Sequence, residues 1–289
     1  MTYIERAMQI AIDEAKQSLR ECNHGFGAVI VKDDEIISQA HDEEETRQDC
    51  TSHAEINAIR KASSRIGKDL SGCVIISTHE PCPMCASAIV WSGISQIAFG
   101  YSIEESLEQG RKRIALNCKD IFKYSGKEIQ ITSNVLYEEC KILYMKGVRS
   151  EIKRLRHTTE ESLRAYNDES KIKRLVWFNE NKASFSFIGK NKTESAYYLL
   201  LHRFGINEEE AQIIEKSEKH VVFHSKNFCP TLEACKILGL DTRYICQHYN
   251  EDSTDSLVKQ IDQTLCFKRN YAKIRPYSDY CEELIVVED

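Results

Sequence analysis

The sequence predicts a layered α/β fold for the first half of the chain and a smaller α+β fold for the second half. In the first half, short continuous apolar runs typical of buried strands alternate with segments that have helical spacing. This alternation indicates a sheet covered by helices. After residue 147 the sequence becomes charged and almost free of glycine and proline, which indicates a boundary between two domains.

The opening segment of the first domain predicts a helix followed by a hairpin. Residues 3–19 carry apolar side chains at helical spacing, and Thr2 with Glu5 has the pattern of a capping box. The stretches GAVIVK and EIISQA, joined by two aspartates, predict a β-hairpin over residues 27–40. Two further buried strands are predicted at 73–78 and 96–100.

Three residues have the chemistry and spacing of a catalytic zinc site. His53 opens the helical segment 53–63, and Cys82 and Cys85 stand three apart at a loop-to-helix transition, so both sulfurs can face one ion. One imidazole and two thiolates leave a fourth tetrahedral position for water, whose pKa the metal lowers to about 7. Glu55 lies near the metal without facing it, which suits a residue that transfers protons.

Two alternatives to a catalytic site remain open. The CxxC pair is either a chance spacing in a cysteine-rich chain or part of a structural zinc site, which a fourth protein ligand closes. His79 and Cys73 are the nearby candidates for that ligand, and His79 is the stronger one because it lies three residues before Cys82. The combination of HAE with PCPMC favours the catalytic interpretation, since it is the signature of zinc nucleobase deaminases.

Residues 1 to about 147 resemble the cytidine deaminase-like superfamily, and within it the branch of guanine deaminases and tRNA adenosine deaminases. The matching stretches are GFGAVIVKDDEIISQAH, TSHAEINAIRKAS and CVIISTHEPCPMCASAIVWSGISQIAFG. The resemblance implies a three-layer αβα sandwich around a mixed five-stranded sheet, with Zn2+ as cofactor. It also implies that His79 belongs to a loop beside the substrate.

The same resemblance implies several substrate contacts. Trp91 would stack on a purine, Phe26 would pack on the other side of the base, and backbone amides around Ala54 would orient it. Asp120 would be a second catalytic residue that assists proton transfer. Two alternatives stay open: Trp91 as a core aromatic, and Asp120 as a solvated or helix-capping residue.

Asp42 departs from the family pattern. The family usually has an asparagine in the loop before HAE, where its amide contacts the base, and this chain has Asp42 there. An ionised carboxylate only accepts hydrogen bonds, whereas an amide also donates. Asp42 therefore opens the substrate range to an amino-rich base, an aminotriazine or a modified purine. Asp49-Cys50 also replaces the usual Asp-Pro.

The charge distribution favours a small neutral base over a tRNA. The net charge is −6, and the loop HDEEETRQD carries four consecutive acidic residues before the metal motif. The short basic cluster Arg111-Lys112-Arg113 is interpreted as a solvated helix face. We therefore expect a small-molecule partner and a homodimer, and neither nucleic acid nor membrane, although an oligomer could assemble a basic surface that one chain hides.

The composition predicts a cytoplasmic protein. Apolar stretches are too short to span a membrane, and the N-terminal residues do not resemble a signal peptide. The twelve cysteines are accordingly expected to be reduced thiols and metal ligands rather than disulfides.

The change in sequence character after residue 147 predicts that the chain has three parts. These are a deaminase domain at 1–150, a charged helical linker at 151–172 and an α+β accessory domain at 173–289. TESAYYLLLHRF, NEEEAQIIEKSE and STDSLVKQIDQTL predict helices, and VVFH and ELIVVE predict strands. Pro230 suits a first helical position, which would place Cys229 at the N-cap where the helix dipole stabilises a thiolate.

The role of this accessory domain stays open at the level of sequence. It faintly resembles domains similar to aminothiazoline carboxylate hydrolase. Six residues either form a second metal site or are mostly buried packing, namely Cys229, Cys235, Cys246, His224, His248 and Cys281.

The sequence as a whole predicts a zinc hydrolase that deaminates a free purine-like base, with guanine favoured. One alternative is a tRNA adenosine deaminase. Another is a regulatory module in which the first domain only binds a base and the second domain signals.

Overall fold

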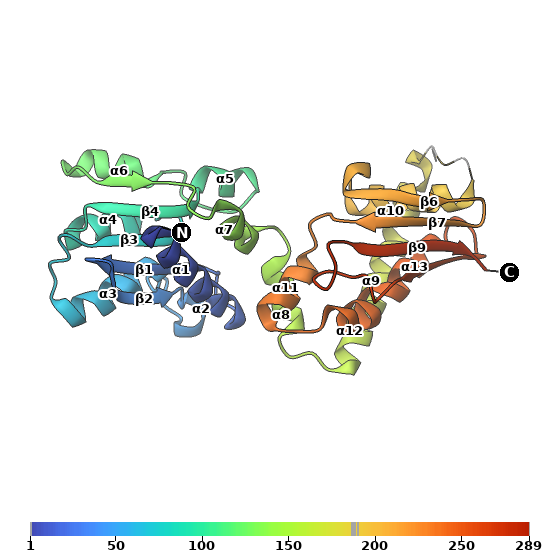
Figure 1. Ribbon diagram of the computed structural model, residues 1–289, viewed down its shortest axis with the longest axis horizontal. Helices are drawn as coiled ribbons and strands as arrows, with labels where there is room; N and C mark the ends of the chain where they lie inside the picture. Colours follow the sequence, from blue (N-terminus) through green and yellow to red (C-terminus); the bar gives the residue numbers. More distant parts are fainter. Residues whose placement is uncertain (1, 186–188, 190, 289) are drawn as a thin grey trace. The chain divides into compact units, whose positions relative to one another are not determined.

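The computed structural model describes residues 2–185, 189 and 191–288. The chain divides into two compact units, Met1–Arg156 and His157–Asp289, which are described separately (Figure 1). Among the described residues, no helix is both long enough and apolar enough to cross a membrane.

The first unit begins as the sequence predicts. Helix α1 spans Tyr3–Arg20, and Thr2 and Glu5 form the expected capping box. Strands β1 (Gly27–Lys32) and β2 (Glu35–His41) form the hairpin, and both aspartates at its turn have positive φ. Helix α1 packs closely on β1 at Gly27, which has no side chain. A Cβ atom there would lie 1.9 Å from the carbonyl oxygen of Ala11.

A mixed five-stranded sheet forms the centre of this unit. Its order is β2-β1-β3-β4-β5, with β3 at Val74–His79, β4 at Gln96–Tyr101 and β5 at Gln130–Thr132. Strand β1 runs antiparallel to β2 and β3, whereas β3, β4 and β5 are parallel. Successive residues of β1 and β3 are buried, so helices cover both faces of the sheet. The predicted fold is confirmed.

Two helix N-termini bring the metal motif together. Helix α3 (Ala54–Ile66) begins directly after His53, and α4 (Pro83–Ser92) begins directly after Cys82. The two helices pack against each other beside the sheet (Figure 1). The remaining helices of the unit are α2 (Glu44–Arg47), α5 (Ile103–Glu108), α6 (Cys118–Ser125), α7 (Tyr137–Tyr144) and α8 (Val148–Leu155).

The structure divides the expected linker between the two units. Helix α8 belongs to the first unit, where Ile152 and Leu155 are buried. Helix α9 (Glu160–Asn181) belongs to the second unit and packs against α13 (Asp252–Val258). One face of this charged helix is buried, at Leu163, Asn167, Arg174 and Phe178, so the segment is part of a folded domain.

The second unit is a four-stranded antiparallel sheet with helices. The strand order is β6-β7-β9-β8, with β6 at Ala211–Lys216, β7 at His220–Ser225, β8 at Leu265–Arg269 and β9 at Cys281–Val287. Helix α10 (Lys192–Phe204) packs against β7 and β9. The other helical elements are η1 (Lys182–Ser184), η2 (Glu208–Glu210), α11 (Pro230–Leu238), α12 (Thr242–Cys246) and the π-helix η3 (Gln247–Glu251).

One predicted helix of the second unit is wrong. NEEEAQIIEKSE forms the short turn η2 and then strand β6, because AQIIEK pairs antiparallel with β7 and Ala211 is buried in the core. The strand β8 was not predicted. Its five residues alternate between buried and accessible positions, but they follow a segment with helical spacing and carry two basic side chains.

Candidate metal centre and active site

The structure brings the three predicted zinc ligands together. Nδ1 of His53 lies 3.5 Å from Sγ of Cys82 and 3.5 Å from Sγ of Cys85. Tetrahedral zinc with bonds of about 2.3 Å to sulfur and about 2.0 Å to nitrogen would separate these atoms by about 3.5 Å. All three ligand atoms lie within 4.8 Å of one another. The donor set and its spacing therefore fit a zinc ion that keeps one position open.

One of the two sulfur ligands, Cys82, favours the thiolate form, whereas the hydrogen bond to Cys82 and burial raise the pKa of the other, Cys85. The thiol of Cys85 hydrogen-bonds to Cys82 and, with His53, lowers the pKa of Cys82 to about 4. Cys82 is also the N-cap of α4, where the helix dipole favours a thiolate. Zinc binds thiolates rather than thiols, so little free energy is spent on deprotonating Cys82 when the metal binds.

Glu44 fixes the orientation of the His53 ring. Nε2 of His53 faces Oε2 of Glu44 at 3.9 Å, while Nδ1 faces the two sulfurs. A carboxylate behind a ligating imidazole favours the tautomer in which the other nitrogen binds the metal. Glu44 also contacts His24 at 3.5 Å.

Glu55 occupies a buried position next to the ligands. Its residue is 4% exposed, and Oε1 accepts a hydrogen bond of 3.0 Å from the Ser77 hydroxyl. Burial raises the pKa of the Glu55 carboxyl. Ser77 and His79 are two residues apart on β3, so their side chains lie on the same face of the sheet and point toward the metal motif. Glu55 is therefore held rigidly and can both accept and return a proton.

A small cavity of about 30 Å³ adjoins these groups. Its volume is about that of one water molecule. The cavity is lined by Phe26, His53, Glu55, His79, Glu80, Cys82, Ile103, Arg113 and Ile114. Five of these residues were predicted from the sequence to belong to the site: Phe26, His53, Glu55, His79 and Cys82.

Arg113 corrects the interpretation of the basic cluster. Residues 111–113 are not helical, and the guanidinium carbon of Arg113 lies 4.8 Å from the centre of the Phe26 ring. Arg111 donates from Nε to the carbonyl oxygen of Tyr144 at 3.0 Å. Both side chains point inward because aromatic rings attract the guanidinium group. The pattern of charged residues in the sequence could not show that these two arginine side chains point inward.

Glu80 is a further site residue that the sequence did not reveal. Its side chain is buried and accepts hydrogen bonds from the backbone N–H groups of Ile103 (2.9 Å) and Cys118 (2.8 Å). These residues begin α5 and α6, whose first N–H groups have no acceptor within the helix. One carboxylate thus anchors both ends of the segment 103–118, which contains α5 and the loop that carries Arg113. Its position directly before the PCPMC motif was the available signal.

His79 does not act as a fourth zinc ligand here. Its Nδ1 lies 2.8 Å from the carbonyl oxygen of Glu80, and its Nε2 lies 2.7 Å from the Ser106 hydroxyl. Burial lowers the pKa of His79 to about 3, so the ring is neutral. Neither His79 nor Cys73 belongs to a cluster of potential metal ligands within the described residues.

Asp42 lies beside the metal ligands in an unusual state. Its carboxylate clusters with Glu44 and His53 within 4.8 Å. Oδ1 accepts a hydrogen bond from the backbone N–H of His24 at 3.1 Å, whereas Oδ2 is buried without a partner among the described residues. Burial raises the pKa of Asp42. An unpaired buried oxygen next to a metal site is a ready acceptor for a ligand.

The cavity lining does not include five of the predicted site residues: Asp42, Ala54, Cys85, Trp91 and Asp120. Trp91 is 87% exposed, because α4 buries Cys85 and Ile89 and position 91 falls on the opposite side of the helix. Asp120 lies in the first turn of α6, where its charge complements the helix dipole. Neither residue lines the cavity. Ala54 opens α3 directly after the ligand His53, so its N–H lies at the free N-terminus of the helix.

Comparisons with known proteins identify the first unit. Residues 1–101 match the family model described as the cytidine and deoxycytidylate deaminase zinc-binding region. The chain is 36% identical over 141 residues to the tRNA-specific adenosine deaminase of Bacillus subtilis (strain 168), which covers 48% of this chain and 85% of that protein. The chain belongs to this family of zinc-dependent deaminases.

Two other relatives carry different names within the same family. The tRNA-specific adenosine deaminase of Aquifex aeolicus (strain VF5) is 43% identical over 96 residues, covering 33% of this chain and 64% of that protein. The guanine deaminase of Bacillus subtilis (strain 168) is 36% identical over 110 residues, which is 38% of this chain and 69% of that protein. The family model ends at residue 101, so the resemblance of the C-terminal part stays a prediction.

Replacing one sulfur ligand should remove the metal from this deaminase. We expect Cys85→Ala to lose most of its zinc, because two donors hold the ion far less tightly than three, and to unfold at a lower temperature. Metal analysis of purified protein and thermal unfolding measure both effects. Cys140→Ala is a matched control, since Cys140 is also a buried thiol of the same unit. Full zinc occupancy in Cys85→Ala would show that the ligand set is wrong.

Proposed function

We propose that the first unit hydrolyses the exocyclic amine of a free purine-like nucleobase, with guanine as the favoured substrate, and releases ammonia. The observation that carries the proposal is the buried Glu55 carboxylate, fixed by Ser77 beside three zinc ligands. A zinc ion held there lowers the pKa of water to about 7, which supplies a nucleophile at neutral pH.

Glu55 performs the proton transfers in this proposal. Its carboxylate takes one proton from the attacking water and passes it to a ring nitrogen of the base. It then takes the second proton from the hydroxyl now attached to the ring carbon and gives it to the amine, so that the C–N bond breaks, ammonia leaves and a C=O bond remains. Ser77 holds one carboxylate oxygen at 3.0 Å, which leaves the other oxygen to face the reacting atoms. Phe26 and the neutral His79 ring supply an apolar wall for the base.

The loop that carries Arg113 and Ile114 covers the site. A purine base is much larger than a cavity of about 30 Å³, so admission of the base requires this loop to move outward. Ile114 is 67% exposed, so few packing contacts oppose that movement. Glu80 holds both ends of the segment 103–118, which contains this loop, and lets its middle move.

Charge near the site supports a free base rather than a nucleic acid. Glu44 and Glu45 both lie within 3.6 Å of His24, next to the ligand His53, and they would repel a phosphate backbone. The arginines at positions 111 and 113 are turned toward aromatic rings. The unpaired Oδ2 of Asp42 suits a donor on the base, such as a ring N–H or an amino group.

A tRNA adenosine deaminase is the second candidate. It is favoured by the names of two relatives, at 43% and 36% identity. Deamination at an adenine uses the same zinc and carboxylate chemistry, so the site geometry alone suits both substrates.

Ammonia release from a panel of substrates tests the proposal directly. We expect the purified zinc protein to release ammonia from guanine faster than from adenosine, cytosine or a tRNA, because the acidic surroundings favour an uncharged base. Release from the tRNA alone would replace the proposal with the second candidate. Release from none of them, with full zinc occupancy, would favour a base-binding regulatory module.

Glu55→Gln should keep the metal and lose turnover. Glutamine has nearly the same shape but cannot carry a proton, and general acid/base catalysis commonly contributes about 100-fold to 10,000-fold to the rate. Steady-state rates and zinc content are measured together. The exposed Glu128→Gln is the control and should behave like the wild type. Near-normal activity of Glu55→Gln would eliminate this residue as the proton carrier.

Asp42→Asn should change substrate preference. The substitution replaces an obligate acceptor with a group that both donates and accepts, and a buried polar group left unpaired costs about 1 to 3 kcal/mol. We expect the ratio of kcat/KM between guanine and an aminotriazine to shift by about tenfold. An unchanged ratio for guanine, the aminotriazine and cytosine would show that Asp42 does not contact the base.

A further inference from the structure

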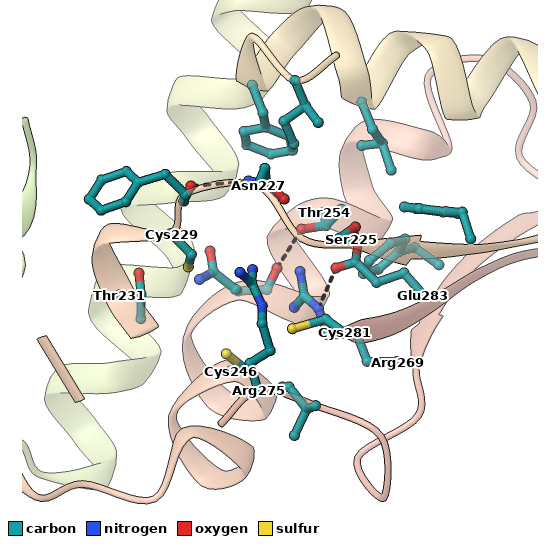
Figure 2. A pocket seen from close by; sticks show the side chains of 18 of the residues that line it. Ser225, Asn227, Cys229, Thr231, Cys246, Thr254, Arg269, Arg275, Cys281 and Glu283 are labelled. Carbon is teal, nitrogen blue, oxygen red and sulfur yellow. Dashed lines mark hydrogen bonds and ion pairs between the residues drawn. The ribbon is translucent and has the colours of Figure 1, made fainter. Parts of the chain in front are cut away.

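The second unit contains a cavity of about 270 Å³ that is separate from the zinc site. This volume approaches the lower limit of small-ligand pockets, about 300 Å³. Figure 2 shows side chains from several elements around it, including Cys229 before α11, Cys246 at the end of α12 and Cys281 at the start of β9. Much of the wall is apolar, formed by Leu200, Leu201, Phe204, Phe223, Phe267 and Ile274.

Three arginines and one glutamate line this cavity: Arg174, Arg269, Arg275 and Glu283. Glu283 accepts hydrogen bonds from Nε of Arg269 at 2.8 Å and from the Ser225 hydroxyl at 2.6 Å. One negative charge therefore offsets only one of the three positive charges. The cavity has a surplus of positive charge inside an apolar wall.

Arg174 is buried, and its hydrogen bonds within the described part of the chain go to neutral groups rather than to a carboxylate. The residue is 8% exposed, and its guanidinium donates to Asn250, to the Ser253 hydroxyl at 2.8 Å and to the Thr254 hydroxyl at 2.7 Å. These neutral acceptors solvate the cation but do not neutralise it. Burial, and then repulsion from Arg269 and Arg203, lowers the pKa of Arg174 to about 9.

Two guanidinium nitrogens at the cavity lack acceptors. Nη1 of Arg269 and Nε of Arg275 are buried without a hydrogen-bond partner within the described part of the chain. Among the residues that the structure describes, Arg275 has one acceptor, the carbonyl oxygen of Lys226 at 3.1 Å from Nη1. A buried cationic donor without an acceptor is costly, and an anion in the cavity would remove that cost.

The thiols around the cavity do not supply the missing negative charge. Burial raises the pKa of Cys229, and it raises the pKa of Cys246 to about 12. Both are therefore neutral at physiological pH. The predicted second metal site is not assembled either, since no cluster of potential ligands among the described residues includes these cysteines, Cys235, His224 or His248.

We propose that this cavity binds a small organic anion. Its carboxylate or phosphate group accepts hydrogen bonds from Nη1 of Arg269 and Nε of Arg275, near the positive charge of Arg174. Its apolar body packs against the phenylalanine and leucine side chains of the wall. The site does not depend on the deaminase reaction, because every group in it belongs to the second unit.

Calorimetric titration of the full-length protein tests this site. The probes are benzoate and phenyl phosphate, which share one apolar ring and differ in the anionic group, and benzamide, which is the uncharged match of benzoate. We expect one of the two anions to bind at least about tenfold more tightly than benzamide, because a charge-assisted hydrogen bond forms only with the anion. The preferred anion identifies the acidic group of the ligand.

Variants locate the binding in the cavity. Arg275→Gln should weaken binding of the preferred anion by about tenfold or more, and Arg275→Lys should weaken it less, because the charge remains. Arg164→Gln is the control, since Arg164 belongs to the same unit and its side chain is 71% exposed. Thermal unfolding without probe checks that each variant is folded. The proposal is overturned by three results: no binding of either anion at millimolar concentration, equal binding of benzamide, or unchanged binding to folded Arg275→Gln.

Discussion

The chemistry of the first unit depends on the meeting of two helix N-termini. Because α3 begins after His53 and α4 begins after Cys82, Nδ1 of His53 lies 3.5 Å from each of two sulfurs without any long side chain having to reach across. The sheet fixes both helices, and the parallel strands β3 and β4 flank the segment that leads into α4. Glu55 lies in the first turn of α3, where Ser77 of β3 donates to it, and Glu80 lies between β3 and α4 and accepts from the N–H of Ile103. A shift of either helix would separate the ligands from the proton carrier.

Two cysteines show how strongly the surroundings decide reactivity. Cys82 and Cys229 are both N-caps of helices that begin with proline, so the local sequence predicts a stabilised thiolate for each. Hydrogen bonds from Cys85 and His53 lower the pKa of Cys82 to about 4. Burial raises the pKa of Cys229 instead. The helix dipole is a small effect of at most about 2 kcal/mol, so desolvation and direct partners outweigh it.

The sequence predicted the first unit more fully than the second. Helix α1 with its capping box and the hairpin of β1 and β2 follow from short-range rules, and so does the start of α4 at Pro83. In the second unit, AQIIEK forms an edge strand because it pairs with β7, the next strand along the chain, and this pairing overrides the helical spacing of the segment. The charged segment after residue 147 shows helical spacing at Ile152 and Leu163, but the sequence predicts an exposed linker there, because the burial of these side chains depends on packing partners.

The sequence by itself identified the candidate zinc ligands and the carboxylate proposed to carry protons, because metal coordination requires specific atoms at a specific spacing. The same spacing rule could not place side chains that reach the site from elsewhere. Only the tertiary structure put Trp91 in solvent, turned Arg113 onto Phe26 and left Oδ2 of Asp42 unpaired. It alone gathered three arginines around one cavity in the second unit. These outcomes depend on which surfaces pack together, and burial and charge pairing are properties of that packing rather than of neighbours along the chain.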